Sequence, residues 1–310
     1  MSPRNLFLLT GLLVILVLMY VVIQRAQQPR GVREALMVRL GKKSWAQADE
    51  LRVWLGSEPD KVLRIVFRNG HWEVWGPSPK ENFPRPAKES LVREFLTRLS
   101  QLSGEERVRG SSYLAQFSLT EKAALHLAGF REKQKLFHLL VGKRGPYWDS
   151  TFVRLEGEQT IFLVPENLLA RFAIWKEKPA LPAASSWVDL SILNPALSEV
   201  EEVSFSSGGK EVYVLRREKK GWRLRFRGEE KEISAGEAER KLRILFPLMA
   251  QEVVAPEKKP REIGRLLVRT RLHTYTLILS RQGKDYFLRR SPYLYRIDKD
   301  TVRRITQLRD

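Results

Sequence analysis

Arginine is the residue type in this sequence whose number and spacing point most directly to chemistry. In the stretch Trp222–Arg227, large apolar residues alternate with arginines. Successive side chains of a β-strand point to opposite faces, so this alternation predicts a strand with one apolar face and one basic face. More arginines follow later in the chain, and the complete set of candidate contact residues is Arg223, Arg225, Arg227, Arg269, Arg271, Arg289, Arg290, Arg303 and Arg304.

A basic face of this kind favours contact with a polyanion, either the headgroups of anionic lipids or a cell-wall polymer. The alternative is a set of solvated charges that only keeps the protein soluble. Nucleic acid is not an expected partner, because the sequence contains no recognised nucleic-acid motif and its aromatic residues alternate with arginine as core residues do.

Signatures of catalysis and of metal binding do not occur in the sequence. The chain has no Cys and 4 His, which excludes thiolate ligands and cysteine nucleophiles. Neither G-x-S-x-G nor H-E-x-x-H is found, and Gly41-Lys42-Lys43-Ser44 lacks the spacing of a phosphate-binding loop. We therefore expect a non-enzymatic protein with no catalytic residue, no metal and no cofactor.

The composition is that of a folded, basic protein. The 310 residues include 55 Lys and Arg against 36 Asp and Glu, which gives a formal net charge of +19, and 43% of the residues are hydrophobic. A chain of this length accommodates about two domains.

An apolar run near the start of the chain predicts a membrane anchor. Leu6–Ile23 contains 18 residues without charge or proline, which as a helix would be about 27 Å long, close to the thickness of a bilayer core. The run exceeds the apolar core of a signal peptide, about 7–15 residues, and no good cleavage site follows it. We expect a single-pass protein of the cell membrane, held in the lipid bilayer by this helix.

The segments on either side of the predicted anchor are a tail at residues 1–5 and a basic juxtamembrane segment at residues 24–43. Charge alone leaves the orientation open, because the whole chain is basic.

Two halves of the remaining chain follow the same pattern. Residues 51–101 align with residues 201–251 without a gap, and Trp72 falls on Trp222. Each copy shows three strand-like runs followed by a run with helical spacing. The sequence therefore predicts a first repeat at 44–178, a linker at 179–195 and a second repeat at 196–310.

Local signals place the elements within these repeats. Asn69-Gly70 lies between two alternating runs and predicts a hairpin. Ser234 with Glu237 predicts the start of a helix, and Pro247 predicts that this helix kinks or ends early. The first repeat has about fifteen residues more than the second, which the sequence assigns to an extra helix over residues 117–130. The predicted fold class is α+β: an N-terminal transmembrane helix, then two repeated units of antiparallel strands with packed helices.

Three features carry a family resemblance. They are the His-Trp and Gly-Trp strand starts at residues 71–72 and 221–222, the block LLVGKRGPYWDSTFVRLEGEQTIFLVPENLL at residues 139–169, and the linker SSWVDLSILNP at residues 185–195. With them the chain resembles the bacterial membrane-anchored proteins of the domain-of-unknown-function 4340 family. The resemblance implies association with ABC-transporter components of the gliding-motility type and a soluble part outside the cytoplasm. It supplies no catalytic residue.

Two hypotheses about function follow from these observations. The first is a non-enzymatic accessory or scaffold protein that acts through protein–protein contacts, with ABC-transporter subunits as its partners. The alternative is a module that binds a polyanion at the membrane surface through its arginine-rich faces.

Overall fold

The computed structural model describes residues 13, 15–17, 19–20, 36–219, 221–255 and 258–308. The chain divides into two compact units. The first comprises Met1–Asp49, Val53–Pro59 and Arg93–Leu181, and the second comprises Glu50–Arg52, Asp60–Val92 and Pro182–Asp310.

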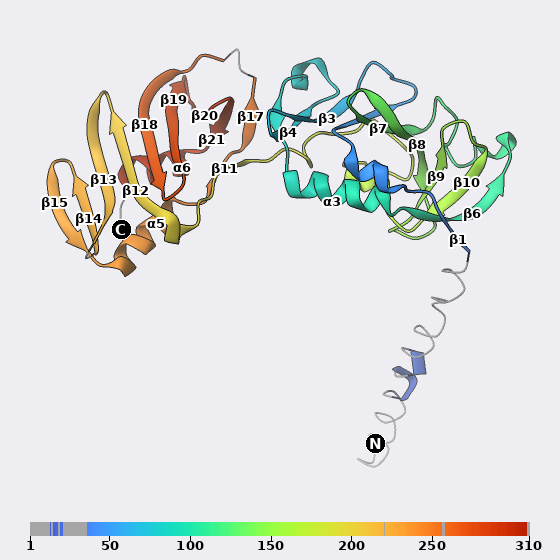
Figure 1. The fold of residues 1–310 in the computed structure, drawn as a ribbon, viewed down its shortest axis with the longest axis horizontal. Coiled ribbons are helices and arrows are strands. Elements are labelled where there is room, and N and C mark those ends of the chain that lie inside the picture. The colour runs from blue at the N-terminus through green and yellow to red at the C-terminus, as the bar shows by residue number, and fades with distance from the viewer. Residues whose placement is uncertain are drawn as a thin grey trace, which may run out of the picture. The chain divides into compact units, whose positions relative to one another are not determined.

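The strands form three antiparallel sheets (Figure 1). The first sheet has the order β1 (Met37–Arg39), β6 (Ser103–Arg109), β10 (Thr160–Val164), β9 (Thr151–Leu155), β8 (Gln134–Arg144), β7 (Leu125–Arg131), β2 (Glu50–Leu55), β3 (Leu63–Arg68), β4 (His71–Trp75) and β5 (Arg85–Pro86). The second has the order β15 (Glu229–Ile233), β14 (Gly221–Phe226), β13 (Lys210–Glu218), β12 (Val200–Ser207), β18 (Arg261–Thr270), β19 (Thr274–Gln282), β20 (Asp285–Arg290), β21 (Tyr293–Ile297) and β17 (Glu252–Val254). The third pairs β11 (Ser191–Leu193) with β16 (Leu248–Met249).

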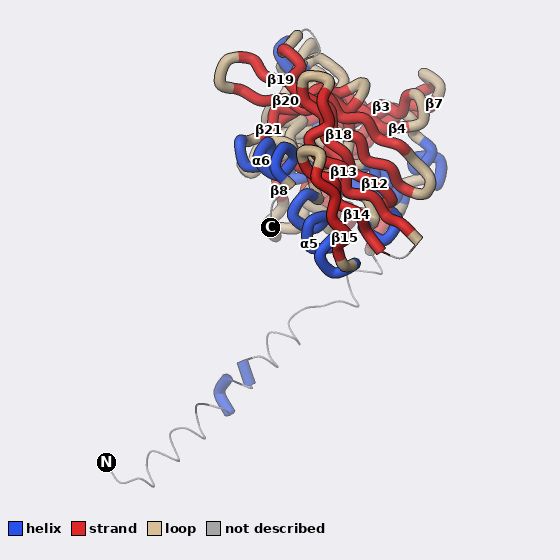
Figure 2. The backbone as a smooth tube through the Cα atoms, turned by 90° about the vertical axis from the view of Figure 1, so that its left-hand side faces the viewer, coloured by secondary structure: helices blue, strands red, loops and turns tan. Residues whose placement is uncertain are grey.

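Helices are short and few in the part of the chain that the structure describes from residue 36 onward. They are α3 (Glu89–Ser100), α4 (Leu168–Arg171), α5 (Ala235–Leu245) and α6 (Lys299–Gln307), together with the 3₁₀ helices η1 (Lys43–Gln47), η2 (Pro79–Glu81), η3 (Ser111–Tyr113) and η4 (Leu197–Glu199). Figure 2 shows how far the strands, in red, outweigh the helices, in blue.

The first and second sheets arrange their strands in the same order. From β6 to β5 the first sheet runs 6-10-9-8-7-2-3-4-5, and from β17 to β15 the second runs 17-21-20-19-18-12-13-14-15, so each strand has a counterpart of the same rank along the chain. Along the chain, a helix follows the corresponding strand of each sheet: α3 follows β5, and α5 follows β15. This shared order is what two copies of one unit would give, whereas the domain limits 44–178 and 196–310 stay a prediction.

The predicted α+β class is wrong, because the protein is mostly antiparallel β-sheet. The clearest local error concerns residues 117–130, whose Ala, Leu, Glu and Lys residues favour a helix. The second half of this segment is strand β7, which pairs with β8 over seven positions from Leu125↔Val141 to Arg131↔Gln134. Pairing with a neighbouring strand overrides the weak helix propensity of the segment.

The predicted membrane anchor is also corrected. No helix within the described residues combines the length and the apolar character that a membrane span requires. This finding contradicts the transmembrane helix and the membrane location predicted from Leu6–Ile23, and most of that run lies outside the described residues.

Other local predictions are confirmed. Asn69 and Gly70, with φ of 51° and 83°, form the turn between β3 and β4. The Ser234 hydroxyl accepts a hydrogen bond from the Glu237 amide and begins α5, which ends at Leu245, two residues before Pro247. Turn chemistry and helix caps are local, so the sequence alone identifies them.

The two large sheets differ in how their faces are covered. In the first sheet, Leu125–Gly129 of β7 and all five residues of β10 are buried, which requires cover on both faces. Residues 110–124, here called the covering segment, provide it on one face, where Leu119 packs against Leu140, Phe152 and Ile161. In the second sheet, β18 alternates buried residues with the exposed Arg265 and Arg269, so one face meets solvent. The buried face contacts α6, where the Tyr213 hydroxyl donates to the Ile305 carbonyl at 2.8 Å.

Candidate functional site

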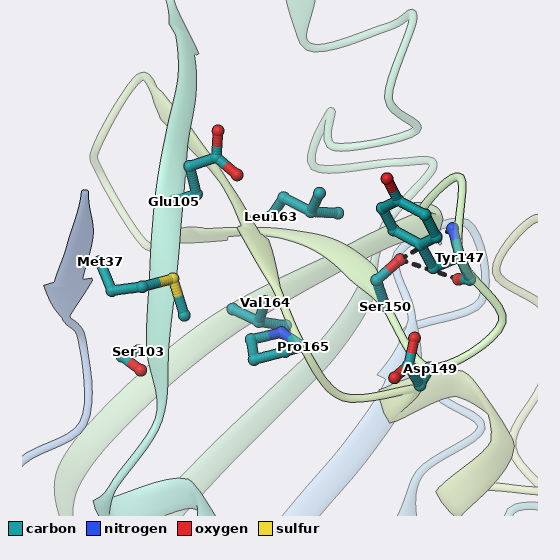
Figure 3. A pocket seen from close by; sticks show the side chains of 9 residues that line it. All are labelled: Met37, Ser103, Glu105, Tyr147, Asp149, Ser150, Leu163, Val164 and Pro165. Carbon is teal, nitrogen blue, oxygen red and sulfur yellow. Dashed lines mark hydrogen bonds between the residues drawn. The ribbon is translucent and has the colours of Figure 1, made fainter. Parts of the chain in front are cut away.

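A pocket of about 390 Å³ opens on the first sheet and is lined by residues of β1, β6 and β10 and of the turn after β8 (Figure 3). Strand pairing explains why residues so far apart in sequence meet there. Met37 of β1 lies opposite Glu105 of β6, and Glu105 lies opposite Leu163 of β10. Paired residues point to the same face of a sheet, so these side chains form one row across three strands. The complete lining is Met37, Ser103, Glu105, Tyr147, Asp149, Ser150, Leu163, Val164 and Pro165.

A tight turn after β8 forms one wall of the pocket. The Ser150 amide donates to the Tyr147 carbonyl at 3.1 Å, and the Ser150 hydroxyl donates to the same oxygen at 2.8 Å. Gly145 lies so close to this turn that a Cβ there would meet Ser150 Oγ at 2.3 Å. These contacts order the turn that carries Tyr147 and Asp149, and Figure 3 shows both residues on this turn beside Ser150.

The lining combines an apolar floor with two carboxyl groups. Met37, Leu163, Val164 and Pro165 are apolar, whereas Glu105 and Asp149 carry acidic side chains. Arg107 approaches Glu105 with an N–O distance of 3.3 Å. A site of this kind suits a ligand with an apolar body and a cationic or hydroxyl group. No metal-binding group of His, Cys, Asp and Glu side chains exists among the described residues.

Exposed aromatic side chains border the pocket. Tyr147 is 50% exposed and Trp148 is 59% exposed. The Arg144 guanidinium lies 4.4 Å from the centre of the Trp148 ring, and the Asn167 side-chain amide donates to the Trp148 carbonyl at 2.8 Å. Exposed aromatic rings held in a defined position are typical of protein-binding surfaces.

Comparison with known families places this pocket within a family domain. A family model described as "Domain of unknown function (DUF4340)" matches residues 75–264 of the 310-residue chain. The chain belongs to this family. The resemblance predicted from the sequence is thereby confirmed. The match covers every lining residue of the pocket in this DUF4340 protein except Met37. A search of the curated proteins found no match.

The arginines predicted as polyanion contacts of the DUF4340 chain are in the second unit, and none of them lines the pocket. Arg223 and Arg225 lie together on β14, where the register sets them opposite Arg216 and Val214 of β13. Each is surrounded by carboxylates: Arg223 by Glu218 at 3.0 Å and Glu230 at 3.6 Å, and Arg225 by Glu211 at 2.9 Å. The predicted basic face of the strand exists, but carboxylates of the neighbouring strands β13 and β15 surround its arginines.

Both signs of charge also occur together across the exposed face of the second sheet. Arg269, Glu202, Arg216, Arg223 and Glu232 lie opposite one another in turn on five neighbouring strands. We call these five residues the charged row. Glu202 accepts from Arg216 at 2.6 Å and from Arg269 at 3.2 Å. The guanidinium groups of the row are thus largely neutralised by their neighbours.

The remaining predicted arginines are dispersed. Arg227 occupies a turn with φ of 51° and lies over the Phe226 ring, and Arg271 donates its backbone amide to the Glu199 carbonyl. Arg290 donates to the Ile192 carbonyl at 2.6 Å. Arg289 of β20 lies opposite Ile278 of β19 and Leu294 of β21. On α6, Arg303 contacts Asp300, and Arg304 donates to the Thr301 hydroxyl at 3.0 Å.

Sequence reasoning missed the pocket itself. One signal was available, because Pro146-Tyr147-Trp148-Asp149 places two large aromatic residues in a turn, where such residues are rarely needed for packing. The row of Met37, Glu105 and Leu163 had no such signal, since it depends on the strand register.

Proposed function

We propose that this DUF4340 protein is a non-enzymatic binding protein that acts through protein–protein contacts at the pocket of β1, β6 and β10. The partner segment has an apolar side chain that fills the pocket and a Lys or Arg next to it. The observation that carries this proposal is the apolar floor of the pocket together with Glu105 and Asp149, in a chain whose net charge is +19. Because Arg107 already approaches Glu105, the exposed Asp149 is the carboxylate that selects a cationic ligand group.

The chemistry of the lining favours binding over catalysis. The only hydroxyl groups in the lining belong to Ser103, Ser150 and Tyr147, and Ser150 Oγ donates to the Tyr147 carbonyl. None of the lining residues is a histidine that could activate a hydroxyl as nucleophile. The accessory or scaffold role expected from the family resemblance, with an ABC-transporter-type assembly as partner, requires no more than such a binding site.

The experiment uses the full chain and a synthetic library of heptapeptides with a central Leu. Binding is measured by fluorescence anisotropy. Peptides with Lys or Arg beside the Leu should bind about fivefold more tightly than those with Glu, which is the scale of a partly exposed charge contact. Trp148→Ala and Tyr147→Ala should abolish most of the binding, and Asp149→Asn should remove the preference for a cation.

Trp175→Ala is the matched control, because Trp175 is 64% exposed, lies in the same unit and does not line the pocket. Equal binding by the wild type, Trp148→Ala and Tyr147→Ala would refute the proposed site. Binding that favours Glu over Lys peptides would refute its proposed chemistry.

The polyanion-binding alternative has less support. Arg223, Arg225 and Arg269 already contact carboxylates within hydrogen-bonding or ion-pair distance. A polyanion would have to displace those carboxylates, which removes most of the gain from each new contact.

A further inference from the structure

Two histidines form a continuous chain of hydrogen bonds beneath the covering segment. His126 of β7 and His138 of β8 have side chains that are only 6% and 9% exposed. His126 Nε2 lies 2.7 Å from the Glu121 carbonyl oxygen, and His126 Nδ1 lies 2.9 Å from His138 Nε2. At the other end, His138 Nδ1 lies 2.7 Å from a carboxylate oxygen of Glu156.

These contacts fix the number of ring protons. The Glu121 carbonyl only accepts, so His126 Nε2 carries a proton, and the Glu156 carboxylate only accepts, so His138 Nδ1 carries another. The contact between His126 Nδ1 and His138 Nε2 needs one proton between its two nitrogens. The two rings therefore hold three protons, one more than two neutral imidazoles have.

The third proton could satisfy the same contacts only if it moved to Glu156. Lys135 prevents this, because its ammonium group binds the second carboxylate oxygen of Glu156. The hydrogen bond from Lys135, assisted by His138, lowers the pKa of Glu156. The extra charge therefore stays on the imidazoles.

Within the pair, the charge belongs on His138. Burial lowers the pKa of His126, and the nearby Arg154 acts in the same direction. His138 instead faces the carboxylate of Glu156. The indole of Trp54 stacks on His126 at 4.9 Å and lies 5.2 Å from His138. The charged groups that face the pair are Glu121 of the covering segment, Lys135 of β8, Arg154 of β9 and Glu156 of the β9–β10 turn.

We propose that His126 and His138 share three ring protons at neutral pH and hold the covering segment on the first sheet only in that protonation state. A fourth proton would place two N–H groups against each other across the 2.9 Å contact between the rings. His126 would then turn away from the Glu121 carbonyl, which belongs to the covering segment. Mild acid therefore releases residues 119–124, and the pair acts as a pH-sensitive latch.

The first test counts the ring protons in the wild-type full chain. Nitrogen NMR of ¹⁵N-histidine at pH 7.5, assigned with His126→Gln and His138→Gln, should show both ring nitrogens of His138 protonated and only Nε2 of His126 protonated. Two neutral rings at pH 7.5 would overturn the proposal.

The second test measures release of the covering segment by hydrogen exchange. After correction for intrinsic rates, exchange in residues 119–124 should be about tenfold faster at pH 5.5 than at pH 7.5, because opening is coupled to the uptake of one proton by His126. In His126→Gln the amide can donate to Glu121 and accept from His138 Nε2–H but cannot take a further proton. This variant should stay protected at both pH values.

His273→Gln is the control, because His273 is exposed and belongs to the second unit; it should open in acid as the wild type does. Acid opening of His126→Gln equal to that of the wild type, or no acid opening of the wild type, would overturn the proposal. If His126→Gln is unprotected even at pH 7.5, the proposal is tested by the nitrogen NMR measurement of the wild type alone.

Discussion

The first and second sheets have the same strand order, yet one face is buried in the first sheet and exposed to solvent in the second. On the first sheet the covering segment buries that face, together with Arg154 and the two histidines. On the second sheet the exposed face displays the charged row, in which Arg216 is 50% exposed and Arg269 is 45% exposed. Burial of a polar face requires that each group find a defined partner, whereas an exposed face can rely on water.

The difference shows how about fifteen extra residues change the chemistry of a sheet. Arg154 is 4% exposed and donates to the Leu119 carbonyl at 2.8 Å and to the Glu158 carbonyl at 3.2 Å. Its contacts therefore tie the covering segment to the sheet. In the charged row the partners are exposed side chains on neighbouring strands, so the loss of any one contact should reduce stability only slightly. We expect the same substitution to have a large effect in the first sheet and a small one in the second.

The largest expected effect is that of Arg154→Met. The substitution leaves the Leu119 and Glu158 carbonyls without this donor, which should cost about 2–4 kcal/mol of unfolding free energy. The exposed Glu121 loses its partner at little further cost. Arg216→Met, the control in the charged row, should cost less than about 1 kcal/mol. Urea unfolding of both variants measures these losses. Equal losses would show that burial by the covering segment does not set the difference.

Lower pH should weaken the first sheet more than the second. Burial lowers the folded-state pKa of His126 below its ordinary value of 6.5. The unfolded chain then binds the proton more readily, so this contribution to stability is complete above pH 6.5 and is lost as the pH falls toward the folded pKa. Arginine and glutamate side chains ordinarily keep their charge between pH 5.5 and 7.5. After correction for intrinsic rates, hydrogen exchange in β8 should therefore be faster at pH 5.5 than at pH 6.5, whereas exchange in β19 should not change. Parallel changes in both strands would contradict the contrast.

The sequence allowed prediction of those features that depend on neighbouring residues. The turn at Asn69-Gly70 and the cap at Ser234 are of this kind, and so is the alternation of Arg223 and Arg225 on β14. Each follows from backbone preferences or from the two-residue period of a strand. The family resemblance likewise depended on local motifs.

The sequence did not predict the features that depend on strand register or on packing between distant segments. His126 was assigned to a helix, and only its place opposite Leu140 shows that it contacts His138. The pocket residues Met37, Glu105 and Leu163 come from three strands whose order the sequence does not give. The same holds for the carboxylates that neutralise the predicted arginines, because Glu202 meets Arg269 only through the pairing of β12 with β18.

A smaller effect is expected for Glu202→Gln in the charged row. The Glu202 side chain is 11% exposed and accepts from two arginines. Its replacement leaves Arg216 and Arg269 beside an uncharged amide, which should cost about 1–2 kcal/mol of unfolding free energy. Glu262→Gln removes an exposed ion pair with Arg265 and should cause no measurable change. In 1 M NaCl the loss for Glu202→Gln should shrink, because salt screens the repulsion between the arginines; a loss that is independent of salt would point to packing instead.

The smallest effect is expected where the sequence alone predicted the strongest one. If the arginines of β14 formed a polyanion site, the double substitution Arg223→Ala, Arg225→Ala would weaken heparin binding by the full chain about tenfold or more and reduce its salt dependence. Because Glu211, Glu218 and Glu230 already occupy these guanidinium groups, we expect a change of less than about twofold. Glu230→Gln sharpens the comparison, since removal of a shared carboxylate should strengthen heparin binding if internal neutralisation is the cause. Surface plasmon resonance on immobilised heparin at two salt concentrations separates the outcomes. A tenfold loss in the double variant would restore the polyanion function and show that the charged row opens to admit a ligand.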